Sequence, residues 1–169
     1  MFEAGDPVIH PIRGAGVVLG VEERSRQDGS RQYYRIRLLS EPGTTVMIPV
    51  DVADELGLRE AIPRSKLGRV WRVFHARPGT LPTDHKARYK VLEERLHTGD
   101  VLQVAEAVRD IAWHQEREGR LTTVGKRIYE RGLALLAGEV AAAQGTDLSE
   151  AEAQVRAELQ QGMSPAAVA

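Results

Sequence analysis

The chain lacks cysteine altogether, and only 5% of its 169 residues are aromatic. Without cysteine there is no disulfide, no thiolate ligand for a metal and no thiol nucleophile. No apolar run approaches the roughly 20 residues that a membrane-spanning helix needs, and no secretory signal opens the chain. These absences favour a globular cytoplasmic protein that has no membrane partner.

The motifs of common enzymes are absent as well. Gly14 and Gly16 lack the third glycine and the following helix of a dinucleotide site, and there is neither a P-loop nor a G-x-S-x-G sequence. The five histidines, at positions 10, 75, 85, 97 and 114, do not have the H-x-x-x-H spacing of a helical zinc site. Glu93 and Glu94 are adjacent and point in different directions, so they do not form an acid–base pair. We therefore expect no catalytic residue, no metal and no cofactor.

Charge is distributed unevenly along the chain, although the net charge is only −1. Residues 63–99 carry nine Lys and Arg against three Asp and Glu, whereas the segments before and after are both acidic. A local basic stripe on an otherwise acidic chain can attract a polyanion without binding every surface. Residues 63–99 are therefore a candidate region for contact with a polyanion.

The first fifty residues have the patterns of short β-strands joined by turns. In the segment 31–39, the side chains of Tyr34, Ile36 and Leu38 alternate with polar ones and face one way. Gly20 is expected to mark a bend or a bulge. The expected strands are Asp6–His10, Val17–Arg26, Arg31–Leu39 and Thr45–Val50. Short curved strands with hairpin links are typical of a small barrel that serves as a binding module.

Beyond residue 63 the hydrophobic period changes from 2 to 3.6, which indicates helices over residues 64–76, 82–96, 101–117, 124–143 and 148–160. We expect Trp71 to lie in the core, because it shares a stripe with Val70 and Phe74. The predicted fold class is α+β: an N-terminal small antiparallel Tudor- or SH3-like β-barrel, then a compact bundle of about five helices. The predicted divisions are a barrel at 1–52, a linker with a helical turn at 53–63, a helical domain at 64–162 and a flexible tail at 163–169.

The stretch Pro82–Lys90, which reads P-T-D-H-K-A-R-Y-K, begins the second predicted helix. Thr83 or Asp84 is suited to cap its first turn. Three cations follow, and His85 and Tyr89 stand four residues apart on one face. Such an arrangement suits a phosphate backbone with the rings against a base step or groove wall. A solvated basic face with Tyr89 in the core fits the same residues.

Several motifs occur together in the order of a known family. They are F-x-x-G-D-P-V-I-H-P-x-x-G-A-G-V-V at Phe2–Val18, the strand Thr45–Pro49, P-T-x-x-x-x-R-Y-K at Pro82–Lys90, L-x-x-G-D-V at Leu96–Val101 and V-A-E-A-V-R-D at Val104–Asp110. On these motifs the chain resembles the CarD/CdnL family of bacterial RNA polymerase-binding transcription regulators. The N-terminal domain of that family is shared with transcription-repair coupling factors.

The resemblance implies that the two parts of the chain bind different partners. The barrel docks on the RNA polymerase β subunit near its β1 lobe, and the helical domain reaches promoter DNA at the upstream edge of the transcription bubble. There a basic face holds the backbone and a tryptophan wedges into the minor groove, so the open complex is stabilised without base-specific recognition.

Carried over by position, the resemblance implies DNA contacts at Arg88, Lys90 and Lys126. His85, at the wedge position, and Lys86, from the same basic stretch, complete the predicted DNA-binding set. The resemblance implies RNA polymerase contacts from the hairpin and last strands of the barrel, with Arg24 as the matching cation. The predicted RNA polymerase-binding set is Arg24, Arg35, Arg37, Met47 and Pro49. The chain departs from the family at two positions: the wedge tryptophan falls on His85, and an arginine used by some members falls on Met47. Because imidazole offers less apolar surface than indole, a wedge at His85 is expected to be weaker by about 1–2 kcal/mol.

Other functions also fit the sequence. The first alternative is a polymerase-binding adaptor that makes no DNA contact and whose helical domain recruits another protein. A second is a stress or repair adaptor related to the coupling factors, in an accessory role because the chain has no ATPase motif. We expect a monomer, with exchange of barrel strands as the route to a dimer.

Overall fold

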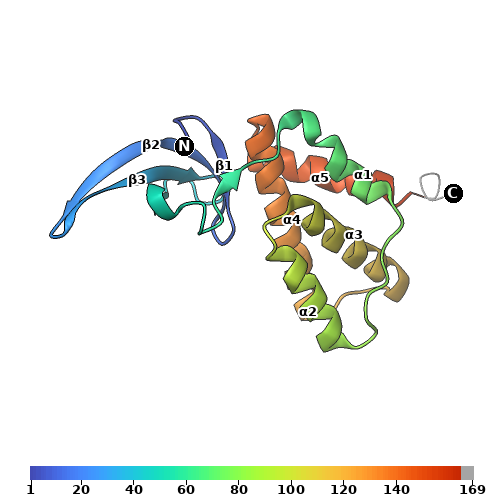
Figure 1. Ribbon diagram of the computed structural model, residues 1–169. Helices are drawn as coiled ribbons and strands as arrows, with labels where there is room; N and C mark the ends of the chain where they lie inside the picture. The colour runs from blue at the N-terminus through green and yellow to red at the C-terminus, as the bar shows by residue number, and fades with distance from the viewer. Residues whose placement is uncertain (165–169) are drawn as a thin grey trace.

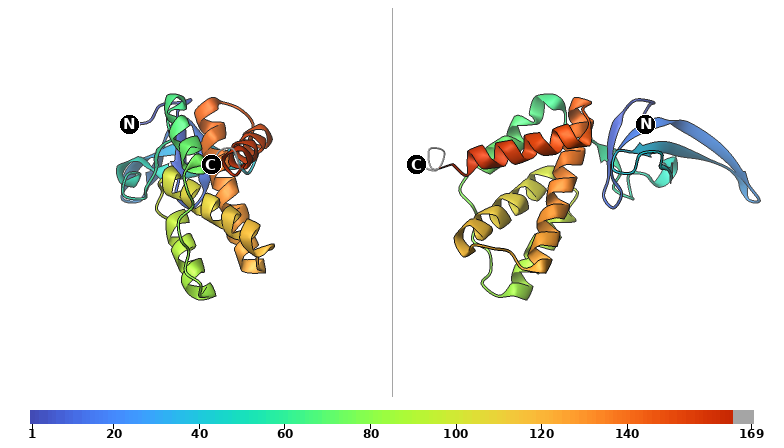
Figure 2. Two further views of the ribbon diagram at one scale, coloured as in Figure 1. Left: turned by 90° about the vertical axis from the view of Figure 1, so that its right-hand side faces the viewer. Right: turned by 180° about the vertical axis from the view of Figure 1, so that it is seen from behind.

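The computed structural model describes residues 1–164 as an N-terminal β-sheet beside a C-terminal group of helices (Figure 1). Seen from behind, the sheet and the helices lie next to each other, and the long β-hairpin extends away from the helices (Figure 2). The predicted α+β fold class is confirmed. Of the tail predicted at 163–169, residues 165–169 lie outside the described residues.

The sheet has five antiparallel strands in the order β4-β3-β2-β1-β5. Their bounds are β1 (Pro7–His10), β2 (Gly14–Arg26), β3 (Gly29–Leu38), β4 (Thr45–Pro49) and β5 (Arg59–Glu60). Strands β2 and β3 form the long curved hairpin of Figure 1. The β2–β3 register shifts between Val18 and Gly20, which confirms the irregularity expected at that glycine.

Strand β2 begins three residues earlier than predicted, because the glycine-rich segment continues the strand after a tight turn. Gly14 pairs with His10 and Gly16 pairs with Val8. A Cβ atom on Gly16 would lie 2.5 Å from Cγ2 of Ile36, so this position accepts no side chain without movement of its neighbours. Glycine here permits close approach of β2 to β3.

The segment 53–63, predicted as a linker with a helical turn, contributes the two-residue strand β5 and buried side chains to the sheet. After a short 3₁₀ turn at Val50–Val52, the chain returns and pairs β5 with β1. Ala53 and Leu58 are buried in the same hydrophobic cluster as Tyr34 and Ile36. Apolar residues beyond the predicted boundary at residue 52 therefore take part in the core of the sheet.

The five helices are α1 (Gly68–His75), α2 (His85–Leu96), α3 (Val101–Glu118), α4 (Thr123–Gln144) and α5 (Leu148–Gly162). Four of them begin at a capping side chain that accepts a backbone N–H of the first turn, namely Asp84, Asp100, Thr122 and Asp147. Local capping explains why the predicted starts of these four helices fall within three residues of the observed ones.

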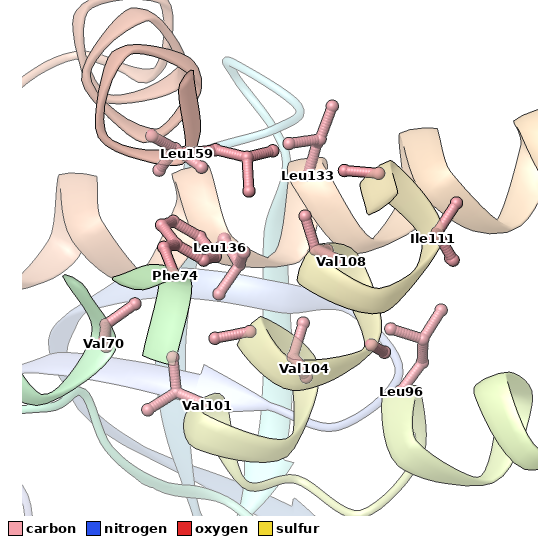
Figure 3. Packing of buried hydrophobic residues seen from close by; sticks show 14 of the residues in the cluster. Val70, Phe74, Leu96, Val101, Val104, Val108, Ile111, Leu133, Leu136 and Leu159 are labelled. Carbon is pink, nitrogen blue, oxygen red and sulfur yellow. The ribbon is translucent and has the colours of Figure 1, made fainter. Parts of the chain in front are cut away.

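The helices enclose one hydrophobic core that includes Phe74 of α1, Val108 of α3 and Leu136 of α4, all fully buried (Figure 3). Trp71, expected in the core, is half-buried and packs on its edge, with its ring 6.1 Å from that of Phe74. No helix within residues 1–164 has the length and apolar character needed to cross a membrane.

The sheet and the helices are joined through α4. Gly138 lies so close to β2 that a Cβ atom there would be 3.2 Å from Cβ of Ala15. Beside this contact, Arg59 of β5 donates two hydrogen bonds of 2.7 Å to the two carboxylate oxygens of Glu139. Glu139 is only 3% exposed and also accepts the backbone N–H of Ile62 at 2.8 Å. This contact sets how the sheet sits against the helices.

Candidate nucleic-acid interface

A basic groove of about 820 Å³ lies where the start of α2, the end of α3 and the start of α4 meet. Four cationic side chains line it: Arg88 from α2, Arg117 and Arg120 from the end of α3 and the following turn, and Lys126 from α4. Among its described lining residues the only carboxylate is Glu118. We call this feature the basic groove; its positive charge makes it a candidate site for a polyanion.

Arg88 is a buried residue of α2 that holds the segment preceding the helix. It is only 7% exposed, and its guanidinium donates to the carbonyl oxygens of Pro82 and Thr83, each at 3.2 Å. It also lies 2.9 Å from Nδ1 of His85. Because three of its five N–H groups have acceptors within the protein, Arg88 contributes charge to the groove while most of its donors are already engaged. The sequence pattern did not distinguish this buried arginine from the exposed lysines beside it.

His85 stands exposed at the first residue of α2, where the cap Asp84 accepts the backbone N–H of Ala87 at 3.0 Å. The Arg88 guanidinium has only hydrogen-bond donors, so its contact with His85 requires Nδ1 of that ring to be the acceptor. The proton of the neutral imidazole is then on Nε2, which leaves that N–H free for a ligand. The ring lies 6.2 Å from that of Tyr89, at an angle of 53°.

Tyr89 connects α2 to α4 at the groove. It is half-buried against the helical core, and its hydroxyl hydrogen-bonds the side chain of Thr122, the residue that caps α4. The guanidinium of Arg88 lies 5.6 Å from the centre of the ring, a distance at which a cation is attracted to the aromatic face. Tyr89 therefore packs against the core, as one interpretation of the sequence had it, and also lines the groove.

His114 of α3 is a groove residue that the sequence analysis did not assign. Burial lowers its pKa from the ordinary histidine value, and the nearby Arg88 guanidinium lowers the pKa further. Smaller effects come from Glu118, which raises the pKa, and from Arg117 and His85, which lower it. Arg117 and Arg120 were also missed, because they lie in a segment with net negative charge. The R-E-G-R sequence at the helix end was the available signal.

The structure divides the five predicted DNA-binding residues between two adjoining places. His85, Arg88 and Lys126 line the basic groove. Lys86 and Lys90 are exposed one turn apart on α2 and are not among the residues that line it. The exposed surface of α2 therefore extends the positive charge beyond the groove.

The predicted polymerase-binding residues come together on one face of the sheet. Arg35 lies directly opposite Met47 in the β3–β4 pair, and Pro49 lies opposite Tyr33 on the same face. Glu22 links two of the predicted arginines, since its carboxylate lies 3.0 Å from Arg24 and 3.5 Å from Arg35.

Arg37 completes this set of residues. It lies opposite Thr45 and is exposed, as Arg24 and Arg35 are. Strand β4 is an edge of the sheet, so this face is bounded by a strand with an unpaired side. We call the five residues Arg24, Arg35, Arg37, Met47 and Pro49 the arginine face. Within residues 1–164 there is no cluster of three or more His, Asp or Glu side chains that could hold a metal.

Comparison with known proteins assigns both parts of the chain. Residues 69–156 match the C-terminal domain of CarD, and residues 2–62 match the CarD-like/TRCF RID domain. The chain belongs to the CarD family of transcription factors. A relative from Bacillus subtilis (strain 168), with the name "Putative transcription factor YdeB", is 28% identical over 145 residues, which is 86% of this chain and 94% of the relative.

Membership of the CarD family confirms the resemblance seen in the motifs. The match to the N-terminal domain ends at residue 62, just after β5, which agrees with the place of that strand in the sheet. The match to the CarD C-terminal domain begins at residue 69, near the start of α1. In this CarD-family chain the basic groove thus belongs wholly to the C-terminal domain, and the arginine face to the N-terminal domain.

Proposed function

We propose that this CarD-family protein docks on the RNA polymerase β subunit through its arginine face and contacts promoter DNA through the basic groove and the exposed face of α2. The proposed polymerase contact is the β1 lobe, and the proposed DNA contact is the upstream edge of the transcription bubble. The observation that carries the proposal is the separation of two basic surfaces onto two domains. Each domain matches its counterpart in the CarD family.

The polymerase contact is supported by the arrangement of the arginine face. Three exposed arginines lie beside Met47 and Pro49, next to the edge strand β4. Arginine and methionine are enriched where proteins meet, because their side chains combine apolar surface with adaptable or bidentate contacts. Met47 in place of an arginine reduces the positive charge of this face and adds a flexible apolar contact.

A binding assay with the isolated β1 lobe tests this contact. Reversal of charge in Arg24→Glu or Arg35→Glu is expected to weaken binding by about tenfold or more, because the mutant side chain repels the surface that attracted the arginine. Arg156→Glu is the matched control, since Arg156 is an exposed arginine of α5, in the other domain. Equal binding by all three variants would remove the arginine face from the interface.

The DNA contact is supported by the charge and composition of the groove. Lysines and arginines that meet phosphates release counterions, so the affinity of such a contact falls steeply as salt rises. Lys126 is exposed at the first turns of α4, and Lys86 and Lys90 lie on the adjoining surface of α2. We place these three lysines on phosphates, His85 at the DNA surface, and Arg88 beneath it as the residue that orients His85.

A salt titration of DNA affinity tests the contact. The slope of log affinity against log salt is expected to become shallower by about 0.9 for each lysine replaced by alanine, with Lys126→Ala and Lys90→Ala each removing one phosphate contact. Lys66→Ala is the control, because Lys66 is exposed in the turn before α1 and does not line the groove. Absence of salt-dependent binding to DNA would favour the alternative function, an adaptor that binds polymerase without DNA.

The role of His85 is tested by the lifetime of the open complex. The loss of about 1–2 kcal/mol of apolar burial relative to tryptophan corresponds to about a 5- to 30-fold change in a rate. We therefore expect His85→Trp to lengthen the lifetime by that factor on a given promoter. An unchanged lifetime would mean that position 85 does not act as a wedge in this protein.

A further inference from the structure

We propose that the basic groove receives one unpaired nucleotide, with its base inside the groove and its phosphates at the rim. This inference rests on the proposed function, since it states which form of DNA the groove recognises. The protein would then hold the edge of a bubble by capture of a base that has left the helix, alongside the weaker wedge expected at His85.

The lining of the groove is arranged in a way that suits a nucleotide. Four apolar side chains are among its lining residues: Leu81, Leu92 and Ile111 are buried, and Leu121 is half-buried and offers accessible apolar surface. We call these four residues the apolar floor. A phosphate backbone gains nothing from an apolar floor, whereas the face of a base does. The floor therefore favours a ligand that carries an apolar group together with its negative charge.

Rings and cations surround this floor. Tyr89, His85 and His114 line the groove from two different helices, and rings in such positions stack on a base without regard to its identity. Lys126 and Arg117 line the groove as well, where their charges can meet the phosphates on either side of the captured base. The combination of stacking rings and cations around an apolar floor is the chemistry by which single strands are bound.

The size of the groove agrees with this assignment. Its volume of about 820 Å³ lies within the range of about 300–1,000 Å³ found for sites that enclose small organic ligands. A paired duplex keeps its bases stacked inside the helix, so it can lie across the mouth without placing a base against the floor. An unpaired nucleotide is already free of its partner, so its entry costs less unpairing and unstacking energy.

The neutral state of His114 adds to the fit. Burial and the nearby Arg88 guanidinium lower its pKa, so at neutral pH the ring presents one donor and one acceptor to the edge of a base. His85 has its Nε2–H available, because Nδ1 is held by Arg88. The groove thus combines two uncharged imidazole rings with a positively charged rim.

The experiment compares the full chain on two DNAs of the same length and sequence, one fully paired and one with a short unpaired segment at one end. Fluorescence anisotropy is expected to give an affinity about 5- to 150-fold higher for the forked DNA, the range that stacking of one base supports. A 2-aminopurine placed in the unpaired segment is expected to change its fluorescence on binding, because a new stacking environment surrounds it.

Two variants are measured on both DNAs, one as the test of the groove and one as its control. His114→Ala removes one ring of the groove from a helix that accepts alanine well, and it is expected to lower the preference for forked DNA while affinity for the duplex stays the same. Lys90→Ala lies outside the groove and is expected to weaken both DNAs by the same factor. A thermal melt of each variant establishes that it is folded.

The outcomes separate this inference from the proposed function. Salt-dependent binding of both DNAs with equal affinity, or a fork preference that survives His114→Ala with unchanged 2-aminopurine fluorescence, would overturn the captured nucleotide and leave the DNA contact in place. Absence of salt-dependent binding to either DNA would overturn both. A preference for forked DNA that falls in His114→Ala and persists in Lys90→Ala is the expected result.

Discussion

Replacement of Arg59 by methionine removes the cation of the ion pair that joins the sheet to α4, while it keeps most of the side chain's length. Glu139 is then left 3% exposed, with Ile62 N–H as its remaining hydrogen-bond donor. Removal of one partner from a buried ion pair costs about 3–5 kcal/mol, and we expect Arg59→Met to lower the free energy of unfolding by about 3 kcal/mol or more.

Replacement of the other partner, Glu139→Leu, is expected to lower the free energy of unfolding by less. The side chain of Arg59 is 33% exposed and keeps acceptors in the carbonyl oxygens of Gly99, at 2.7 Å, and Glu60, at 3.0 Å. Its charge can therefore reach water, and the main penalty is the unpaired backbone N–H of Ile62, which costs about 1–3 kcal/mol. The double variant loses both charges, so its cost should be well below the sum of the two single costs.

Urea unfolding of the four proteins measures these costs. Both tryptophans, Trp71 and Trp113, lie in the helical domain, so their fluorescence follows the helices while far-ultraviolet circular dichroism follows the whole chain. Arg156→Met is the control, because its ion pair with Glu152 is exposed and is worth about 0.5 kcal/mol. A cost below about 1 kcal/mol for Arg59→Met, or additive costs in the double variant, would refute this account of the contact.

Three further perturbations have defined outcomes. Asp110 is fully buried and accepts hydrogen bonds from Gly79, Arg95 and Arg109, so Asp110→Asn is expected to cost about 2–4 kcal/mol in urea unfolding. Gly162→Ala would place Cβ 2.2 Å from the carbonyl oxygen of Phe74, whereas Gly68→Ala meets nothing within 4 Å; only the first should lower the melting temperature. The pKa of His114 is lowered in the folded state, so as pH falls the unfolded chain takes up that proton first. His114 therefore makes the free energy of unfolding fall as pH drops through the ordinary histidine range. His114→Gln should remove this pH dependence from a series of thermal melts between pH 7.5 and 5.

Much of the fold could be predicted because its signals are local. The strands of the sheet follow from alternation and turn residues, and Tyr34, Ile36 and Leu38 are all buried as expected. The helix starts follow from capping side chains such as Asp84 and Asp100. The short strand β5 escaped prediction because two residues carry no periodicity, and its existence depends on pairing with β1.

The candidate site could be predicted only in part. The basic stretch at the start of α2 was visible as a pattern of charge, but the position of each side chain was not. Arg88 and Lys90 are only two residues apart, and they differ because Arg88 turns toward the carbonyl oxygens that precede α2 while Lys90 stays exposed. No pattern of residue types within one helix distinguishes them.

By itself the sequence determined the α+β class, the order of the elements and the family, because periodicity, capping and motif spacing are written in neighbouring residues. Only the tertiary structure decided that the ends of α2, α3 and α4 meet around one groove, and that Arg59 reaches Glu139 across 80 residues of chain. These contacts depend on how buried apolar surfaces pack, and that packing is a property of the whole chain. The groove that contains His85 and His114 exists for this reason.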